Sequence, residues 1–157
     1  MIFLLEMTLF IIILCMLGLC SCSYYYKPVS WSAFNPPRTP NYFLVCPEAF
    51  CNDYGHPAPK FSIPIEDLFS EVIRVVSLQP RTKIISQDPD TKSLIAVQRT
   101  PLLRFPDVIQ IQMVSLPNKH SSILLYSKSV YGHYDFGVNQ SRCLDWLEKI
   151  QKNLMKA

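Results

Sequence analysis

The sequence predicts an α+β fold, in which a four-stranded antiparallel meander carries an N-terminal and a C-terminal helix packed on one face. Three observations predict it: an amphipathic helical pattern before residue 80, four strand-like runs joined by turn residues, and a second helical pattern near the end of the chain. Helices that flank such a run of strands cover one face of the sheet. The length of 157 residues fits one ordinary domain.

Composition excludes several classes of function. The chain has 15 Lys+Arg against 12 Asp+Glu and no run of consecutive basic residues, so no nucleic-acid partner is expected. Hydrophobic residues make up 49%, which is enough for a packed core and excludes a wholly disordered chain. The sequence contains no P-loop, dinucleotide fingerprint, HExxH helix or GxSxG elbow. We therefore expect no cofactor and no metal, and the sequence names no reaction.

The N-terminus reads as an export signal. Met7–Cys20 holds 14 residues without a charge, and a helix of that length spans about 21 Å at 1.5 Å per residue. The hydrocarbon core of a membrane is about 30 Å thick, so a signal-peptide segment over residues 1–21 is favoured over a full span. Leu19-Cys20-Ser21-Cys22 resembles a bacterial lipobox. In this interpretation Cys22 carries the lipid, palmitate included, and becomes the mature N-terminus.

Two other interpretations of the N-terminus stay open. One is an uncleaved anchor from Ile2 to Tyr26, with Glu6 reaching the membrane interface. The other is simple cleaved secretion. All three place the rest of the chain outside the cytoplasm or on a membrane surface. We expect a lipoprotein anchored in the cell envelope on the periplasmic side.

Residues 22–42 read as a tether rich in proline and aromatic residues, followed by the folded domain over residues 43–157. Eight of the 13 prolines lie between Pro28 and Pro64, which predicts an extended or loop-like path. Trp31 is compatible with the membrane interface and equally with packing on the domain.

The first helix is predicted over residues 64–78. Pro64 suits the first turn, and Pro80 ends the helix. The apolar residues with helical spacing are Ile65, Leu68, Phe69, Val72, Ile73 and Val76.

The four predicted strands cover residues 83–87, 93–99, 108–115 and 122–129. The third strand alternates, with Ile109, Ile111 and Met113 on one face and Gln110 and Gln112 on the other. Turn residues after the first and third strands favour an antiparallel meander.

The last helix is predicted from Asn139, a good N-cap residue, to about Met155. Its apolar stripe consists of Cys143, Trp146, Leu147, Ile150 and Leu154.

The loop over residues 127–139 is the most informative segment. It contains Gly132 and Gly137, two of the three glycines outside the export signal. Glycine is used where the backbone needs a positive φ or a close approach, so we expect a fixed loop conformation. His133 and Asp135 lie between these glycines and are held in one orientation.

Three blocks of the chain resemble the domain of unknown function 1499 family. Its signature ending is matched by Ser129, Gly132, Asp135, Gly137, Val138, Asn139 and Arg142. The Cys46-Pro47…Cys51 block and the stretch Leu103–Asp107 are similar to two earlier family blocks. The resemblance covers roughly residues 43–152. It implies bacterial envelope or plastid-related proteins, often short and N-terminally anchored, with no established activity.

Cys46 and Cys51 have several interpretations. In an oxidising compartment a local disulfide is the leading one, because a tight loop allows the required approach of the two Cα atoms. The alternatives are two separate buried thiols, a zinc site completed by His56 and a distant ligand, and catalytic thiol chemistry.

The remaining polar candidates are His133, Asp135, Asp107, Arg104, Asn139 and Arg142. In one interpretation Arg104, Asn139 and Arg142 line a cleft beside a helix N-terminus that binds a polar or anionic ligand or a lipid headgroup. In a second, Asp135 and Asn139 cap backbone groups while an arginine pairs with Asp107. In a third, His133, Asp135 and Asp107 catalyse a reaction, with His133 as a base.

The sequence therefore favours a membrane-anchored accessory or binding domain without chemistry of its own. The alternative is a hydrolase or transferase that uses Asp135, His133 and Asp107. Expected partners are the membrane, through the N-terminal anchor, and an unidentified envelope protein or small polar ligand.

Overall fold

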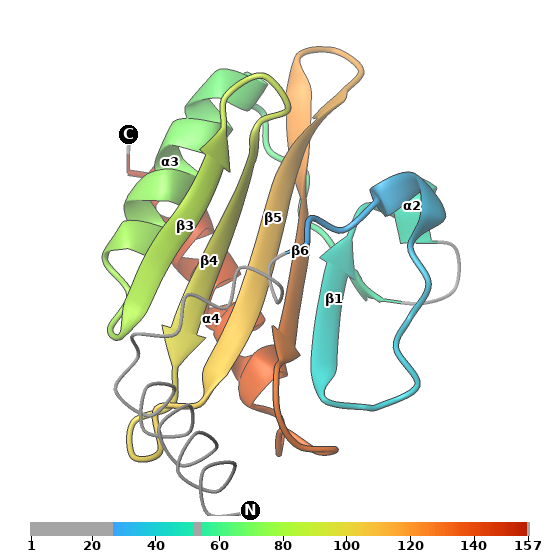
Figure 1. Ribbon diagram of the computed structural model, residues 1–157. Coiled ribbons are helices and arrows are strands. Elements are labelled where there is room, and N and C mark those ends of the chain that lie inside the picture. Colours follow the sequence, from blue (N-terminus) through green and yellow to red (C-terminus); the bar gives the residue numbers. More distant parts are fainter. Residues whose placement is uncertain (1–26, 52–54, 157) are drawn as a thin grey trace, which may run out of the picture.

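A computed structural model describes residues 27–51 and 55–156 (Figure 1). The predicted signal over residues 1–21 and the lipidation site at Cys22 lie outside these residues. No helix in the described part is long and apolar enough to cross a membrane. The elements are, in chain order, η2 (Trp31–Ala33), β1 (Tyr42–Cys46), α2 (Glu48–Cys51), β2 (His56–Pro57), α3 (Ile65–Ser77), β3 (Thr82–Asp88), β4 (Ser93–Arg99), β5 (Pro106–Leu116), β6 (His120–Ser129) and α4 (Val138–Leu154).

The six strands form one mixed sheet in the order β2-β1-β6-β5-β4-β3. Strands β3 to β6 make the predicted antiparallel meander. The α+β class is thus confirmed, but a sheet of four strands is wrong. β1 adds antiparallel to β6, and β2 adds parallel to β1. These strands escaped prediction because β1 is five residues long, lies in the proline-rich region and pairs with a strand about eighty residues away.

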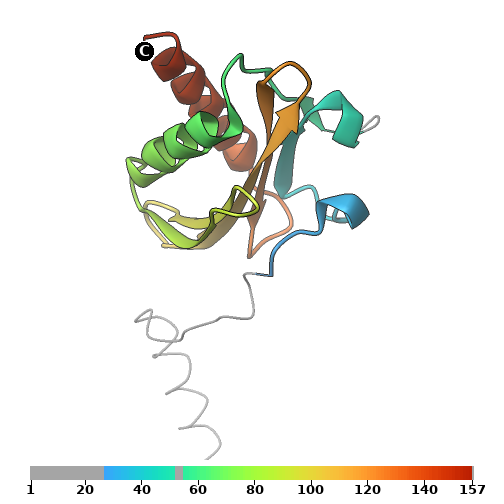
Figure 2. The same cartoon turned by 90° about the horizontal axis from the view of Figure 1, so that it is seen from above.

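Helices α3 and α4 pack on the same face of the sheet, as Figure 2 shows. Burial of their apolar stripes forms the main core. Trp146 of α4 is the largest of its fully buried side chains. The other large side chains that are fully buried there are Leu68, Leu94, Ile109, Ile111, Met113, Ile123, Leu125, Ile150, Val45, Val72 and Val76.

The opposite face of the sheet carries a second, smaller core. The N-terminal segment from Lys27 to Phe34 lies over it, so Trp31 packs on the domain. The ring centroids of Phe34 and Tyr126 are 5.3 Å apart. The side-chain amide of Gln110 forms two hydrogen bonds with the backbone of this segment. Its Nε2 donates to the Lys27 carbonyl at 2.9 Å, and its Oε1 accepts from the Val29 N–H.

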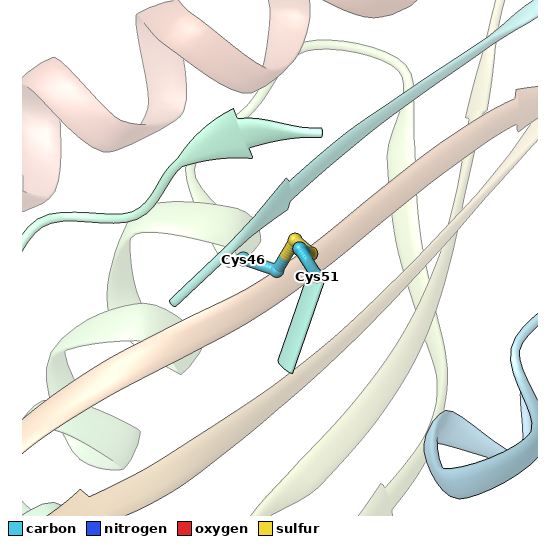
Figure 3. Close-up of a disulfide and its surroundings, with 2 residues drawn as sticks. All are labelled: Cys46 and Cys51. Atoms are coloured by element: carbon cyan, nitrogen blue, oxygen red, sulfur yellow. A yellow bond between two sulfur atoms is a disulfide. The ribbon is translucent and has the colours of Figure 1, made fainter. Parts of the chain in front are cut away.

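A disulfide belongs to this second core. Figure 3 shows the sulfur of Cys46, at the end of β1, bonded to that of Cys51, at the end of α2. Their Cα atoms are 6.0 Å apart. Gly55 packs against the bridge, since a Cβ built there would lie 2.9 Å from the Cys46 Sγ. The leading interpretation of this cysteine pair is therefore confirmed, and zinc binding by free thiols is not available to it.

Candidate functional site

Two connections meet at one end of the sheet, which we call the lower end after its place in Figure 1. They are the β4–β5 connection and the β6–α4 connection. The Val130 N–H donates to the Pro106 carbonyl at 3.2 Å, and the rings of Phe105 and Tyr131 pack edge to face at 5.8 Å. The topology thus brings together the two segments that the sequence singled out.

The register of the sheet gathers polar residues at this end. Gln98 of β4, Asp107 of β5 and Ser129 of β6 are aligned partners. Side chains alternate along a strand, so Asp107 shares the helix-covered face with Ile109 and Ile111. On β6, Ser127 follows the core residues Ile123 and Leu125 at alternate positions, so its side chain lies on the same helix-covered face. The lower end of the main core is therefore lined with polar rather than apolar side chains.

Arg142, in the first turns of α4, is the centre of this polar cluster. Its Nη2 forms an ion pair with the Asp107 carboxylate, and only about 5% and 4% of the two side chains are exposed. Its Nη1 donates to Ser127 Oγ at 2.7 Å, and its Nε donates to Gln98 Oε1 at 2.6 Å. A buried charge is tolerated only when it is paired and hydrogen-bonded, and both conditions hold here.

Asn139 is fully buried and bridges α4 to the strands. Its Nδ2 donates to the Asn41 carbonyl at 3.0 Å and to Ser129 Oγ at 3.1 Å. Its Oδ1 accepts from Arg142 Nη1 at 2.6 Å. We call the whole set the polar network; it comprises Asn41, Gln98, Asp107, Ser127, Ser129, Asn139 and Arg142. No buried side-chain nitrogen or oxygen of the described residues lacks a hydrogen-bond partner.

The N-cap position of α4 is Gly137, and the backbone N–H of Asn139 in the first turn is bound by the Asp135 side chain, so the prediction that Asn139 caps this helix is wrong. The helix begins at Val138, and Asp135 Oδ2 accepts the Asn139 N–H at 2.8 Å. Asp135 Oδ1 accepts the Gly137 N–H at 3.2 Å. Gly137 has φ 79° and Gly132 has φ 87°, which confirms the positive φ expected at these two glycines. The chain makes a turn between Asp135 and Val138, where the Val138 N–H donates to the Asp135 carbonyl at 3.1 Å. The side chain that binds the first-turn amide therefore lies four residues before Asn139 in the sequence.

His133 and Arg104 lie outside the polar network. Both are exposed. The His133 ring packs edge-on against Tyr134 with centroids 4.6 Å apart. Arg104 contributes its backbone carbonyl to Arg99 Nη1 at 3.0 Å. The structure thus joins Asp107, Asn139 and Arg142, places Asp135 beside the first turn of α4, and leaves His133 and Arg104 on the surface.

Cys143 follows Arg142 on the buried face of α4. Burial raises the pKa of its thiol to about 12, although Arg142 and Ser127 act in the opposite direction. The thiolate is the reactive form of cysteine, so this side chain is inert at neutral pH. In the described ranges no group of three His, Cys, Asp or Glu residues is arranged to hold a metal ion.

A cavity that no sequence pattern indicates lies on the outer face of the sheet. It measures about 290 Å³ and lies between the N-terminal segment and strands β3 to β5. Lining residues include Trp31, Asp88, Thr91, Ser93, Gln110 and Gln112. The cavity exists only because residues 28–31 fold back over the sheet, and no local pattern encodes that long-range path.

Comparison with known protein families shows which family this chain belongs to. The family model described as "Protein of unknown function (DUF1499)" matches residues 35–150. The chain belongs to the DUF1499 family. The match spans all six strands and most of α4, so the resemblance of the three sequence blocks is confirmed for nearly the whole described domain.

Solved structures resemble this DUF1499 domain in fold. The crystal structure of Ara h 8.0201 superposes with a TM-score of 0.52 at 11% identity, covering 74% of this chain and 98% of that one. The crystal structure of protein MLL2253 from Mesorhizobium loti gives 0.45 at 10% identity, covering 64% and 96%. The first likeness concerns the fold alone. No curated protein sequence matches the chain.

Proposed function

We propose that this protein is a membrane-anchored accessory or binding domain of the cell envelope that performs no chemistry of its own. The main support is the way its polar residues are used. Asp107 and Arg142 neutralise each other in the interior, and both oxygens of Asp135 accept backbone N–H groups. A general base must reach a substrate proton with an accessible lone pair. Both carboxylates are instead engaged in the architecture of the lower end.

The alternative, a hydrolase or transferase based on Asp135, His133 and Asp107, has less support. Such a site needs the histidine within hydrogen-bond reach of a carboxylate or a nucleophile. His133 instead packs on Tyr134 at the surface, while Asp107 faces Arg142 in the interior.

The anchor is the second part of the proposal. The apolar run before Cys22 and the lipobox-like residues 19–22 support lipid attachment at that cysteine. The Cys46–Cys51 bridge is consistent with an oxidising compartment, since disulfides persist outside the cytoplasm.

Palmitate labelling of a bacterium that expresses the chain tests the anchor. Cys22→Ser should abolish the label, whereas the control Cys20→Ser should retain it. Wild-type protein that stays in the membrane without label would instead indicate the uncleaved anchor.

Complementation of a deletion strain tests the absence of chemistry. His133→Ala should restore the wild-type phenotype in full. A folded, membrane-located His133→Ala protein that fails to complement would favour the enzyme.

A further inference from the structure

Large apolar side chains are exposed mainly at the lower end of the sheet. Among the described residues, all exposed large apolar side chains lie there except Phe50, Ile85 and Met155. We call this set the apolar rim; it comprises Leu78, Leu102, Leu103, Phe105, Tyr131, Tyr134, Phe136 and Val138. Leu102 is 92% exposed and Phe136 is 96% exposed. An apolar cluster of this kind marks an interaction surface.

The upper end of the sheet has a different character. Its β3–β4 connection is Pro89-Asp90-Thr91-Lys92, and its β5–β6 connection is Pro117-Asn118-Lys119. Both are polar turns of the kind that water normally solvates. The concentration of apolar residues therefore belongs to one end and is not a general property of the loops.

Backbone conformation adds to this evidence. Phe136 has φ 54° and Arg104 has φ 58°, although neither is glycine. A bulky side chain in the left-handed region is unfavourable, and an aromatic ring in water is unfavourable as well. Both costs fall on Phe136, which indicates that the outward position of its ring serves an interaction outside the domain.

Positive charge accompanies the apolar rim. Arg81, Arg99 and Arg104 lie along the lower edge, where the Arg99 N–H donates to the Arg81 carbonyl and Arg99 Nη1 donates to the Arg104 carbonyl. Within residues 27–51 and 55–156, the ion pairs formed involve other residues, so these guanidinium groups are not neutralised by carboxylates. Apolar and aromatic tips interleaved with arginine fit an anionic membrane surface.

The path of the chain also points to the lower end. The Lys27 carbonyl is fixed on Gln110, four residues along β5 from Pro106 and six from Leu116. At about 3.3 Å per residue, the lower end is about 13 Å away and the upper end about 20 Å. The five residues back to Cys22 span at most about 18 Å. A lipid on Cys22 can therefore reach the plane of the lower end more readily than that of the upper end.

We infer that the apolar rim is a membrane-docking surface, on which the domain lies against an anionic lipid headgroup layer with Phe136 and Leu102 inserted. This inference rests on the proposed function, because the anchor is what holds the domain at the membrane. The rim and the anchor then form two attachments to one bilayer, and the upper end of the sheet faces away from it.

Tryptophan fluorescence quenching by brominated lipid tests the docking. Phe136→Trp and the control Met155→Trp introduce one indole each, at the rim and at an exposed position beside the upper end. The full chain is reconstituted into vesicles of phosphatidylglycerol and phosphatidylcholine, with and without bromine on the acyl chains. The native Trp31 and Trp146 contribute the same background to both variants. Phe136→Trp should be quenched more strongly than wild type, and Met155→Trp should not.

The outcomes separate the two proposals. Protein that fails to float with the vesicles contradicts the anchor and hence the proposed function. Protein that floats while Phe136→Trp shows no extra quenching contradicts docking alone and assigns the rim to a protein partner. Arg104→Gln in the Phe136→Trp background should weaken docking about fivefold on anionic vesicles, equivalent to about 1 kcal/mol per basic residue. An unchanged signal there would remove the electrostatic part of the inference.

Discussion

The polar network and the apolar rim lie within a few residues of each other, yet they reverse the usual distribution of side chains. Arg142, Asp107 and Asn139 are buried, while Phe136 and Leu102 are almost fully exposed. In most domains the charged residues face water and the aromatic residues face the core. The polar residues of this end therefore stabilise the fold, and the surface available for interaction is the apolar one.

The largest expected effect comes from breaking the centre of the polar network. Arg142→Met should lower the free energy of unfolding by about 3–5 kcal/mol, because the Asp107 carboxylate is left buried without its partner. Denaturant unfolding followed by circular dichroism measures it. Arg104→Met at the same end is the matched control and should change stability by less than about 0.5 kcal/mol. If the two variants lose equally little, the network is not a structural element.

Gly137 joins the two regions, since Phe136 precedes it and Asn139 follows shortly after. Gly137→Ala should cost about 1–2 kcal/mol, because an L-residue is disfavoured at φ 79°. No atom lies within 4 Å of the added Cβ, so the cost is one of backbone conformation alone. Thermal unfolding beside the exposed helix variant Gln140→Ala measures the effect. An unaltered midpoint would mean that the loop adapts without strain.

The pKa of the Cys143 thiol depends on how completely water is excluded from the interior beside the polar network. Its pKa is raised to about 12 by burial, so the folded state holds the proton that the unfolded state releases above pH 9. Stability is therefore fully present below pH 9 and falls as the pH rises toward 12, by about 1 kcal/mol at pH 10. Unfolding free energies at pH 8 and pH 10 measure the change. Cys143→Ala should show a correspondingly smaller decrease over the same interval, and an identical decrease would show that the thiol is not protected.

The smallest effect is expected at the rim itself. Phe136→Ser should change the free energy of unfolding by less than about 0.5 kcal/mol, because the ring is exposed and the backbone strain remains. Equilibrium unfolding in detergent, without a bilayer, measures this change in the free energy of unfolding. A loss above about 1 kcal/mol would show that the ring packs on the domain and would weaken its assignment as a contact residue.

Much of the fold could be predicted because its information is local. Helices α3 and α4 and strands β3 to β6 each repeat apolar residues with the period of their own geometry. The position of the segment over residues 27–34 could not be predicted in this way. It depends on Gln110. The alternation along the strand predicts that this side chain faces solvent, whereas in the structure it binds the backbone of the segment that covers it.

The site was predictable in part for the same reason. Asp107, Asn139 and Arg142 stood out as polar residues able to meet, and they do meet. Ser127 was missed although it follows Ile123 and Leu125 at alternate positions, a continuation that marks the covered face. The exposed rim was missed because its residues are adjacent only after the β4–β5 and β6–α4 connections are brought together.

Hydrogen–deuterium exchange of the full chain, compared between anionic vesicles and detergent, tests the division between network and rim most directly. We predict that vesicles slow exchange in residues 100–105 and 130–138 and leave residues 89–92 and 117–119 unchanged. The amide of Asn139, bonded to the Asp135 carboxylate, should exchange slowly in both conditions. Fast exchange at Asn139 in both conditions would contradict a structural role for the polar network, and vesicle protection at the upper end instead of the lower would contradict docking through the apolar rim.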